Sequence, residues 1–352
     1  MADLLDARPA QPSASRVPRA RTSRALPTAR ARRRYVLVLV ALALLALAFT
    51  YVLLAVDNPM PAGSDGWWRI ARRRITSVTV MGVVAFCQAV ATVSFQTVAQ
   101  NRIVTPSIMG FSSLYVAIQT GAVYFLGVAG IVALQGTTQF LLQTAVMVAF
   151  AVALYGWLLS RRSGNVQLML LIGIVIGGGL GSVAAFMQRL LTPSEFDVLV
   201  ARMFGSVSNA DASYLPVAIP LAAVAGTVLL VRSRRLNVVA LGRAVGTNLG
   251  IDHRRETLVT LFLVSILMAV STAPVGPMTF LGFLVATLAY VLADTHDHRH
   301  VFPLAIGIGY VVLSGAYVVM KHVFYAQGVV SIIVELVGGT LFLVVILRRG
   351  RL

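Results

Sequence analysis

Apolar residues lie along this chain in long, continuous blocks separated by short polar intervals. An α-helix needs roughly 20 apolar residues to cross ~30 Å of hydrocarbon, and the blocks have about that length. The strands of a membrane β-barrel would instead alternate apolar and polar residues. The pattern predicts an all-α polytopic membrane protein with about ten transmembrane helices, approximately at Tyr35–Val56, Ile75–Val98, Ile108–Leu126, Thr138–Leu159, Val166–Leu190, Tyr214–Val231, Thr257–Ala273, Val275–Ala293, Val301–Met320 and Val329–Leu347.

Two intervals between these blocks have distinctive composition. The Pro/Gly-rich segment Ala273–Pro277 predicts a short turn between two helices that hydropathy alone would nearly fuse. The interval Thr192–Ser213 is long for a loop, and we expect it to contain a short helix.

Composition agrees with a membrane protein. Hydrophobic residues make up 58% of the chain and the mean hydropathy is +0.85, whereas soluble domains contain about 45–50% apolar residues. The one cysteine, Cys87, lies inside an apolar block and is expected to be a packed residue. The net charge of +17 reflects basic loops on the cytoplasmic side of a membrane rather than a nucleic-acid partner.

The basic residues also predict the orientation. With the N-terminus inside, 22 of the 29 Lys and Arg residues fall on the inner side. This bias favours an N-in, C-in topology in the plasma membrane. Residues 1–34 hold nine Arg and few large apolar residues, so we expect a disordered cytoplasmic tail followed by one transmembrane domain at 35–350.

The longest polar interval after the first block is Arg232–Arg255. It carries six Arg, is too long for a tight turn and has too few apolar residues to cross a bilayer. Within it, Leu241-Gly242 is followed eight residues later by Leu249-Gly250, with Asp252 close behind. We interpret the interval as a cytoplasmic loop whose short helices form a docking surface.

Two features inside the blocks have alternative interpretations. Gly173, Gly177 and Gly181 recur every four residues, which is typical either of close helix packing or of a smooth wall along a pore or subunit seam. Glu335 is the one acid well inside a predicted helix. A buried carboxylate needs a partner or water, so Glu335 is either a pathway or proton-relay residue or a hydrogen-bonded carboxyl that holds helices together.

No catalytic residues are predicted. A phosphate-binding loop needs Gly-Lys-Ser/Thr, and the one lysine, Lys321, lies between Met320 and His322. ATP hydrolysis would therefore belong to another subunit. The string Asp294–His300 has metal-ligand residue types, but Arg299 lies inside it. A solvated loop is the favoured interpretation, and no metal site is predicted.

The residues after the second block resemble a family signature. Permease subunits of ABC importers for iron–siderophore, haem and vitamin B12 have Gln, four residues, then Asn-Pro-Leu-Ala-x-Pro-x-x-Leu-Gly. The matching residues here are Gln96, Asn101, Pro106 and Gly110, whereas Arg102 replaces the first Pro. Three further segments match in order: Leu241–Asp252, Gly276–Gly282 and Asp297–His300. The chain resembles the siderophore subgroup.

The resemblance implies a type II ABC importer permease that works by alternating access. Its partners would be a second permease, expected to be a paralogue, two ATP-binding subunits that hold ATP and Mg, and an extracytoplasmic substrate-binding protein. The coupling loop would use Leu241, Gly242, Leu249, Gly250 and Asp252. The binding protein would dock on Arg69, Arg72, Arg73 and Arg74, and Asn101 and Ile103 would fall at the cytoplasmic gate.

The sequence therefore predicts a permease subunit, not an enzyme, for iron–siderophore import across the bacterial plasma membrane. It would contact membrane lipid and no nucleic acid. Haem or vitamin B12 is an alternative cargo. A proton-coupled carrier that uses Glu335 is an alternative mechanism.

Overall fold

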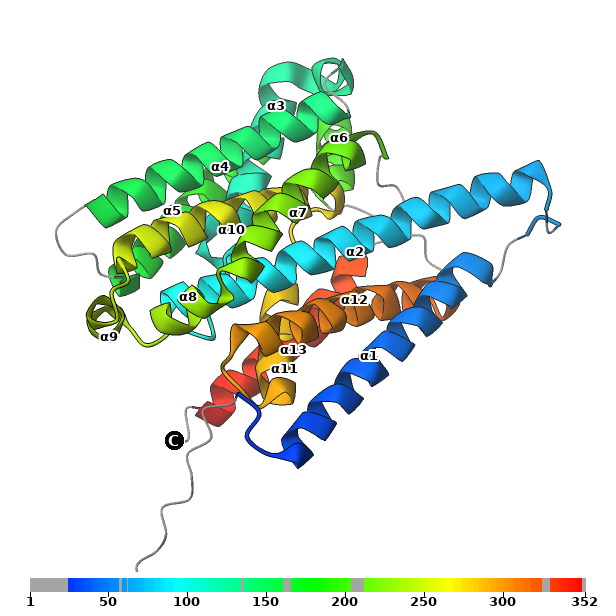
Figure 1. Cartoon of the computed structure of the whole chain (residues 1–352). Coiled ribbons are helices and arrows are strands. Elements are labelled where there is room, and N and C mark those ends of the chain that lie inside the picture. The colour runs from blue at the N-terminus through cyan, green and yellow to red at the C-terminus, as the bar shows by residue number, and fades with distance from the viewer. Residues whose placement is uncertain are drawn as a thin grey trace, which may run out of the picture.

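The computed structural model describes residues 25–56, 59–61, 63–133, 136–160, 166–203, 212–324 and 330–349, and every regular element in these ranges is helical (Figure 1). The elements are α1 (Ala29–Ala55), α2 (Asp65–Ala99), the π-helix η1 (Ser107–Phe111), α3 (Ser112–Ala133), α4 (Thr137–Ser160), α5 (Val166–Gln188), α6 (Pro193–Met203), η3 (Ala212–Tyr214), α7 (Leu215–Val231), α8 (Ser233–Val239), α9 (Arg243–Asn248), α10 (His253–Val275), α11 (Leu281–Ala293), α12 (His298–His322) and α13 (Val330–Arg349).

The predicted transmembrane helices are confirmed in number and order. Among the described residues, 8 helices are long and apolar enough to cross a membrane, and two shorter apolar helices, Leu281–Ala293 and Val330–Val344, complete the set. The short helix predicted between the fifth and sixth blocks is also present, as α6.

Several predicted helix boundaries were wrong, and the largest difference is at α2, which begins at Asp65 rather than Ile75. The chain is helical from Ala29, so the end of the predicted disordered tail, residues 29–34, instead forms the first turns of α1. Thr28 caps these turns, because its hydroxyl oxygen accepts a hydrogen bond from Ala31 N at 3.1 Å. Residues 1–24 lie outside the described part of the chain. The eighth block does not begin its helix at Val275 but at Leu281, because Gly276 (φ +71°) and Pro277 interrupt the helical backbone.

The long helix α2 is the centre of the bundle. It packs against α7, α10, α11 and α12, and most of its inner two thirds is buried. Its 35 residues correspond to about 52 Å at 1.5 Å per residue, well beyond the ~30 Å hydrocarbon core. The excess is the outer end, where α2 extends past the other helices in Figure 1.

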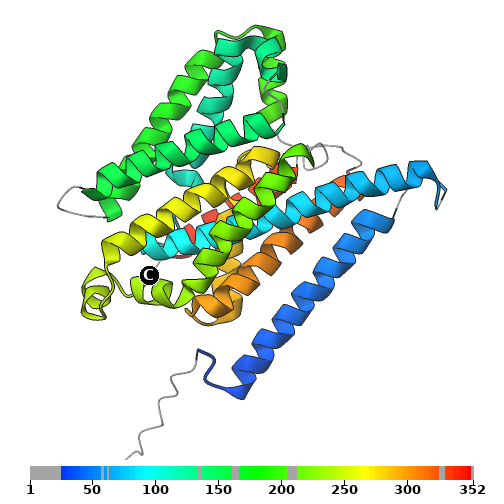
Figure 2. The same cartoon turned by 45° about the horizontal axis from the view of Figure 1, so that its top comes forward.

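The remaining helices surround α2 in two groups. On one side α1 packs against α12, where Thr50 Oγ1 lies 2.6 Å from Tyr310 Oη. The rest of α1 exposes apolar side chains such as Leu37, Leu44 and Tyr51, as expected of a helix that faces lipid. On the other side, α3, α5 and α6 pack together and α4 joins them to α10, forming the separate green group of Figure 2.

Candidate functional site

The polar interval 232–255 folds into two short helices, α8 and α9, at the inner end of the bundle (Figure 1). Gly242 joins them with a φ of +90°, and Gly250 turns the chain back with a φ of +79°. Both angles lie in the left-handed region that favours glycine. Asp252 then caps α10, since its Oδ1 accepts a hydrogen bond from Arg255 N at 3.1 Å. The spaced Leu-Gly pairs therefore have a local structural cause.

An apolar stripe lies on the exposed side of this loop. Leu241, Val245 and Leu249 are 58%, 45% and 58% exposed. Val245 and Leu249 lie one turn apart on α9 and its C-cap, and Leu241 lies at the corner just before Gly242. The opposite side is anchored, because Leu236 and Val239 of α8 are buried. A short apolar stripe held at a fixed place and surrounded by arginines is suited to binding another protein.

An ion-pair cluster fastens the start of this loop to the bundle. The buried carboxylate of Glu256 on α10 pairs with Arg232, and its Oε1 accepts a hydrogen bond from Arg235 Nη1 at 2.9 Å. Glu256 was missed by sequence reasoning. Its place in the first turn of a helix, after a run of arginines, is the signal that could have found it.

The predicted gate segment follows α2, which ends at Gln100 in a left-handed conformation with φ +50°. Asn101 Oδ1 accepts a hydrogen bond from Ile103 N at 2.9 Å, so Asn101 shapes the loop that carries Ile103. Gln96 Nε2 donates to the Arg102 carbonyl oxygen at 2.6 Å. The guanidinium of Arg102, the residue that departs from the family signature, lies 4.4 Å from the centre of the Tyr290 ring and 3.0 Å from His296 Nδ1.

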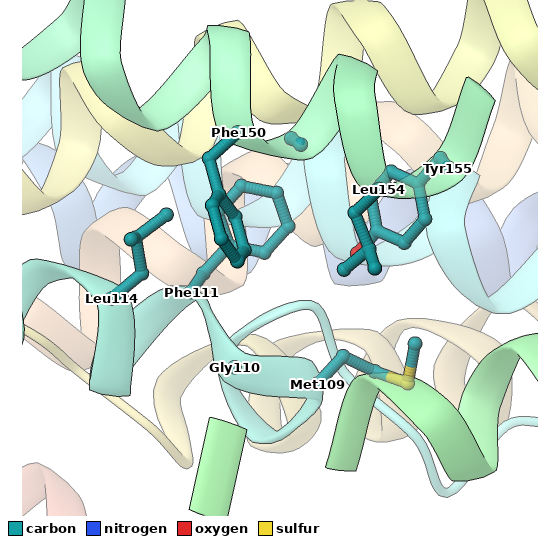
Figure 3. Close-up of a pocket in the computed structure, with 8 residues that line it drawn as sticks. Met109, Gly110, Phe111, Leu114, Phe150, Leu154 and Tyr155 are labelled. Atoms are coloured by element: carbon teal, nitrogen blue, oxygen red, sulfur yellow. The ribbon is translucent and has the colours of Figure 1, made fainter. Parts of the chain in front are cut away.

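The gate segment continues into η1, which packs closely on α5. Gly110 has a φ of +107°, and a Cβ added there would lie 3.2 Å from Gly177 Cα and 3.3 Å from the Gly173 carbonyl oxygen. Figure 3 shows the other side of η1, where Met109, Gly110 and Phe111 face Phe150, Leu154 and Tyr155 of α4. The π-helix η1 is therefore held between α4 and α5.

The glycines of α5 divide into two sets. Gly173 and Gly177 are packed against Met109 and Gly110, which favours close packing for these two. Gly181 has one ordinary contact, with Ser113 Oγ at 3.8 Å, whereas Gly178 and Gly179 have nothing within 4 Å. The exposed glycines, not the packed ones, therefore form the smooth face of α5.

Glu335 lies near the outer end of α13 rather than at its middle. Its Oε1 accepts hydrogen bonds from the backbone N–H groups of Thr279 and Phe280, the latter at 3.4 Å. These are free donors at the start of α11, where the helix dipole also favours a carboxylate. The geometry favours the hydrogen-bonded carboxyl over the proton-relay interpretation.

The four predicted docking arginines do not share one environment. Arg69, Arg72 and Arg73 are exposed and lie on one face of the outer extension of α2. Arg74 instead turns toward α1, and its Nη1 donates to the carbonyl oxygens of Leu54 at 3.2 Å and Val56 at 2.8 Å. The structure thus assigns Arg74 a helix-capping contact.

The side chains of the 294–300 string contact other parts of the chain and do not converge on one point. His296 contacts Arg102, His298 contacts Asn237 and Thr97, and Asp297 accepts from Asn237. Within the described residues, no group of three or more potential ligands is arranged to hold a metal ion. A polar cavity of about 220 Å³ lies beside them, between the gate segment, the α8–α9 corner and α11; its lining includes Gln96, Gln100, Arg102, Leu241 and Tyr290.

The family follows from comparison with known proteins. A model described as the FecCD transport family matches residues 35–348. This chain belongs to the FecCD transport family. The family expected from the motifs is confirmed, and FecCD proteins are transporter permeases rather than enzymes.

Named relatives of this FecCD protein agree with that assignment. It is 47% identical over 332 residues to the petrobactin import system permease protein FatC of Bacillus anthracis, covering 94% of this chain and 94% of that protein. It is 34% identical over 285 residues to the petrobactin import system permease protein YclO of Bacillus subtilis, covering 81% and 90%. Its fold is similar to that of a metal-chelate type ABC transporter in an inward-facing conformation, with a TM-score of 0.75, 21% identity and coverage of 88% of this chain and 99% of that chain.

Proposed function

We propose that this chain is the permease subunit of an ATP-driven importer for iron–siderophore complexes, with petrobactin as the first cargo to test. The observation that carries the proposal is the 47% identity to FatC across 94% of both chains. A second petrobactin permease, YclO, is 34% identical. The match to haem permease HmuU of Yersinia pestis is lower, at 27%, so haem is the weaker alternative.

The second permease is proposed to be a paralogue of this chain. Bacillus anthracis has two petrobactin import permeases that match it, FatC at 47% and FatD at 22% identity. A FatC-like chain would therefore pair with a FatD-like chain. The small, exposed face of α5 at Gly178 and Gly179 is suited to a pore wall or a seam between the two.

The loop α8–α9 is proposed to be the coupling element. Its apolar stripe Leu241, Val245 and Leu249 would bind a surface cleft of an ATP-binding subunit, which holds ATP and Mg. Gly242, Gly250 and Asp252 set the shape of the loop. Closure of the ATP-binding subunits would move this loop and shift the gate segment at Asn101 and Ile103, giving alternating access as a shift between two conformations.

The outer arginines are proposed to receive the substrate-binding protein. Arg69, Arg72 and Arg73 are exposed on a part of α2 that extends beyond the hydrocarbon core. Acidic residues on a binding protein would pair with them and increase the rate of association. Such a role also explains why basic residues persist on the outer side against the positive-inside bias.

The test is uptake of radiolabelled ferric siderophores by cells with and without this gene, using petrobactin, other chelates, haem and vitamin B12. Loss of ferric petrobactin uptake alone, with free iron unaffected, is the expected result. Unchanged uptake of every iron chelate would overturn the siderophore assignment. Uptake that persists without any ATPase partner but fails in Glu335→Gln would instead support the proton-coupled carrier.

A further inference from the structure

A buried histidine connects three elements at the inner end of the bundle. His298, at the start of α12, is 1% exposed. Its Nδ1 contacts Asn237 Oδ1 on α8, and its Nε2 lies 2.6 Å from Thr97 Oγ1 on α2. The His298 backbone N–H also donates to Asn237 Oδ1, at 3.0 Å. A continuous chain of hydrogen bonds therefore runs from the coupling loop through α12 into the central helix.

The donor and acceptor roles in this series of hydrogen bonds follow from the bond between Asn237 and Asp297. Asn237 Nδ2 donates to Asp297 Oδ1 at 2.9 Å, so the amide is oriented with Oδ1 toward His298. An amide oxygen only accepts, hence His298 Nδ1 carries a hydrogen. In a neutral imidazole Nε2 is then the acceptor, so the single Thr97 hydroxyl hydrogen is shared between Nε2 and the Val93 carbonyl oxygen, which lies 2.8 Å from Thr97 Oγ1. The Asn237 amide and the His298 ring have complementary partners, which orients the imidazole.

The contacts around α8 show why the hydrogen bonds through His298 matter for movement of this helix. On one side the Glu256 ion pairs hold the start of α8 to α10. On the other lies the 220 Å³ cavity that separates Leu241 and Gly242 from Gln96 and Arg102 of the gate region. Two polar links join α8 to α2: a long, part-buried hydrogen bond from Gln100 Nε2 to the Val239 carbonyl oxygen at 3.5 Å, and the fully buried route through His298.

We propose that the Asn237–His298–Thr97 chain transmits movement of the coupling loop to α2 and α12, which makes His298 a positioning residue for coupling ATP hydrolysis to transport. This rests on the proposed function, in which α8–α9 binds an ATP-binding subunit. The chain would make α8, α12 and the inner end of α2 move as one unit. Breaking it at either bond would let the loop move without the gate.

The experiment uses the complete importer, with both permeases, the ATP-binding subunits and the binding protein, reconstituted in proteoliposomes with ferric petrobactin. His298→Asn places an amide nitrogen near the position of Nδ1 and loses the bond to Thr97. His298→Gln reaches the position of Nε2 and loses the bond to Asn237. Thr97→Val removes the hydroxyl, and with it the bond to His298 and the local bond to the Val93 carbonyl oxygen within α2. His322→Gln is the matched control, because His322 lies at the far end of α12 and contacts its own helix at the Val318 carbonyl oxygen.

We expect the three network variants to assemble and to hydrolyse ATP, but the chelate transported per ATP to fall about fivefold or more, the lower range of site-to-site coupling. The control should equal the wild type. Thr97→Val should add nothing to His298→Asn, because that variant has already lost the Thr97 bond, but should worsen His298→Gln.

Wild-type transport per ATP in Thr97→Val, or full additivity of Thr97→Val with His298→Asn, would overturn the inference. If the His298 variants fail to assemble, Thr97→Val alone decides, since a methyl replaces the hydroxyl at nearly the same volume. Absence of ATP-driven uptake by the wild-type complex would instead refute the proposed function, which separates the two failures.

Discussion

Two clusters at the inner end of this bundle differ from two contacts at its outer end. At the inner end, Glu256 bonds to Arg232 and Arg235, and His298 bonds to Asn237 and Thr97, so that side chains join separate helices. At the outer end, two ionisable side chains bond instead to backbone groups. Arg74 donates to the carbonyls that end α1, and Glu335 accepts from the N–H groups that precede α11.

The difference agrees with two structural roles, the capping of a helix end and the linking of separate helices. Outer contacts complete a helix end, and each acts locally because helix termini leave backbone donors and acceptors unpaired. Inner contacts join separate helices to a short loop that exposes an apolar stripe. The coupling role proposed for the α8–α9 loop requires links to several helices, whereas a helix end needs only its own cap. Changes at the inner end should therefore affect coupling, and those at the outer end mainly local stability or docking.

The largest loss of stability is expected at the backbone contact between α5 and η1. Gly177→Leu should destabilise the subunit by roughly 3 kcal/mol, because a Cβ there would lie 2.8 Å from Gly110 Cα and backbone cannot give way. Gly178→Leu, with nothing within 4 Å, is the matched control and should leave thermal unfolding of the isolated subunit unchanged. Equal unfolding temperatures for the two variants would refute the packing of η1 on α5.

The Glu256 cluster should come next. Glu256→Gln leaves Arg232 without its anion and should cost about 2–3 kcal/mol, because breaking a largely buried pair strands the other charge. Arg235→Gln should cost less than about 1 kcal/mol, since the Arg235 side chain is 60% exposed. Hydrogen exchange of α8 amides is the measurement. Unchanged protection in Glu256→Gln would mean that the cluster does not hold the loop.

Two variants of Glu335 distinguish a hydrogen-bonded structural carboxyl from a proton-relay residue. Glu335→Ala should cost about 1–2 kcal/mol by leaving the Thr279 and Phe280 donors without a partner. Glu335→Gln keeps an acceptor oxygen, so ATP-driven uptake should stay close to wild type. Uptake abolished in Glu335→Gln while the protein remains folded would restore the proton-relay interpretation.

The outer arginines should fall into two groups, one that affects stability and one that affects docking. Arg74→Ala should lower the stability of the α1–α2 junction by about 1 kcal/mol through loss of two hydrogen bonds, with no direct effect on docking. Arg73→Ala should leave unfolding unchanged and weaken salt-dependent association with the binding protein. Titration of the binding protein against each variant, alongside thermal unfolding, checks both. The reverse pattern would contradict the capping contact of Arg74.

The smallest effect is expected at α6. The backbone N–H of Thr192 and then its hydroxyl donate to Glu195 and lower the pKa of this carboxyl below its ordinary value of 4.5. A lowered pKa means that the carboxylate stabilises α6 at pH above about 4.5 and that this contribution is lost as the pH falls through the folded pKa. Hydrogen exchange of α6 should therefore increase in acid, and Glu195→Gln should abolish that increase.

The sequence was sufficient for the architecture because crossing a bilayer requires long apolar helices. Each of the ten blocks became a helix, and the Pro/Gly turn and α6 were predicted from composition alone. Four motifs in order, at Gln96–Gly110, Leu241–Asp252, Gly276–Gly282 and Asp297–His300, predicted the family. Errors arose at ends: the arginines before Tyr35 are helical, and α11 begins at Leu281, because caps and backbone turns decide where a helix stops.

The candidate site was predicted only in part, because many of its side chains contact residues that are distant in the sequence. Nothing near Glu335 in sequence indicates that it caps α11, and nothing near Arg74 indicates that it turns toward α1 rather than outward. The histidines at 296–300 have metal-ligand residue types, yet His296 contacts Arg102 in the loop after α2, His298 contacts α8 and α2, and His300 packs on Tyr35 of α1. Periodicity and charge bias are local properties, so the sequence determined the helices and their orientation. Hydrogen bonds between residues up to 265 positions apart, such as Tyr35 with His300, depend on how the helices pack, and only the tertiary structure decided them.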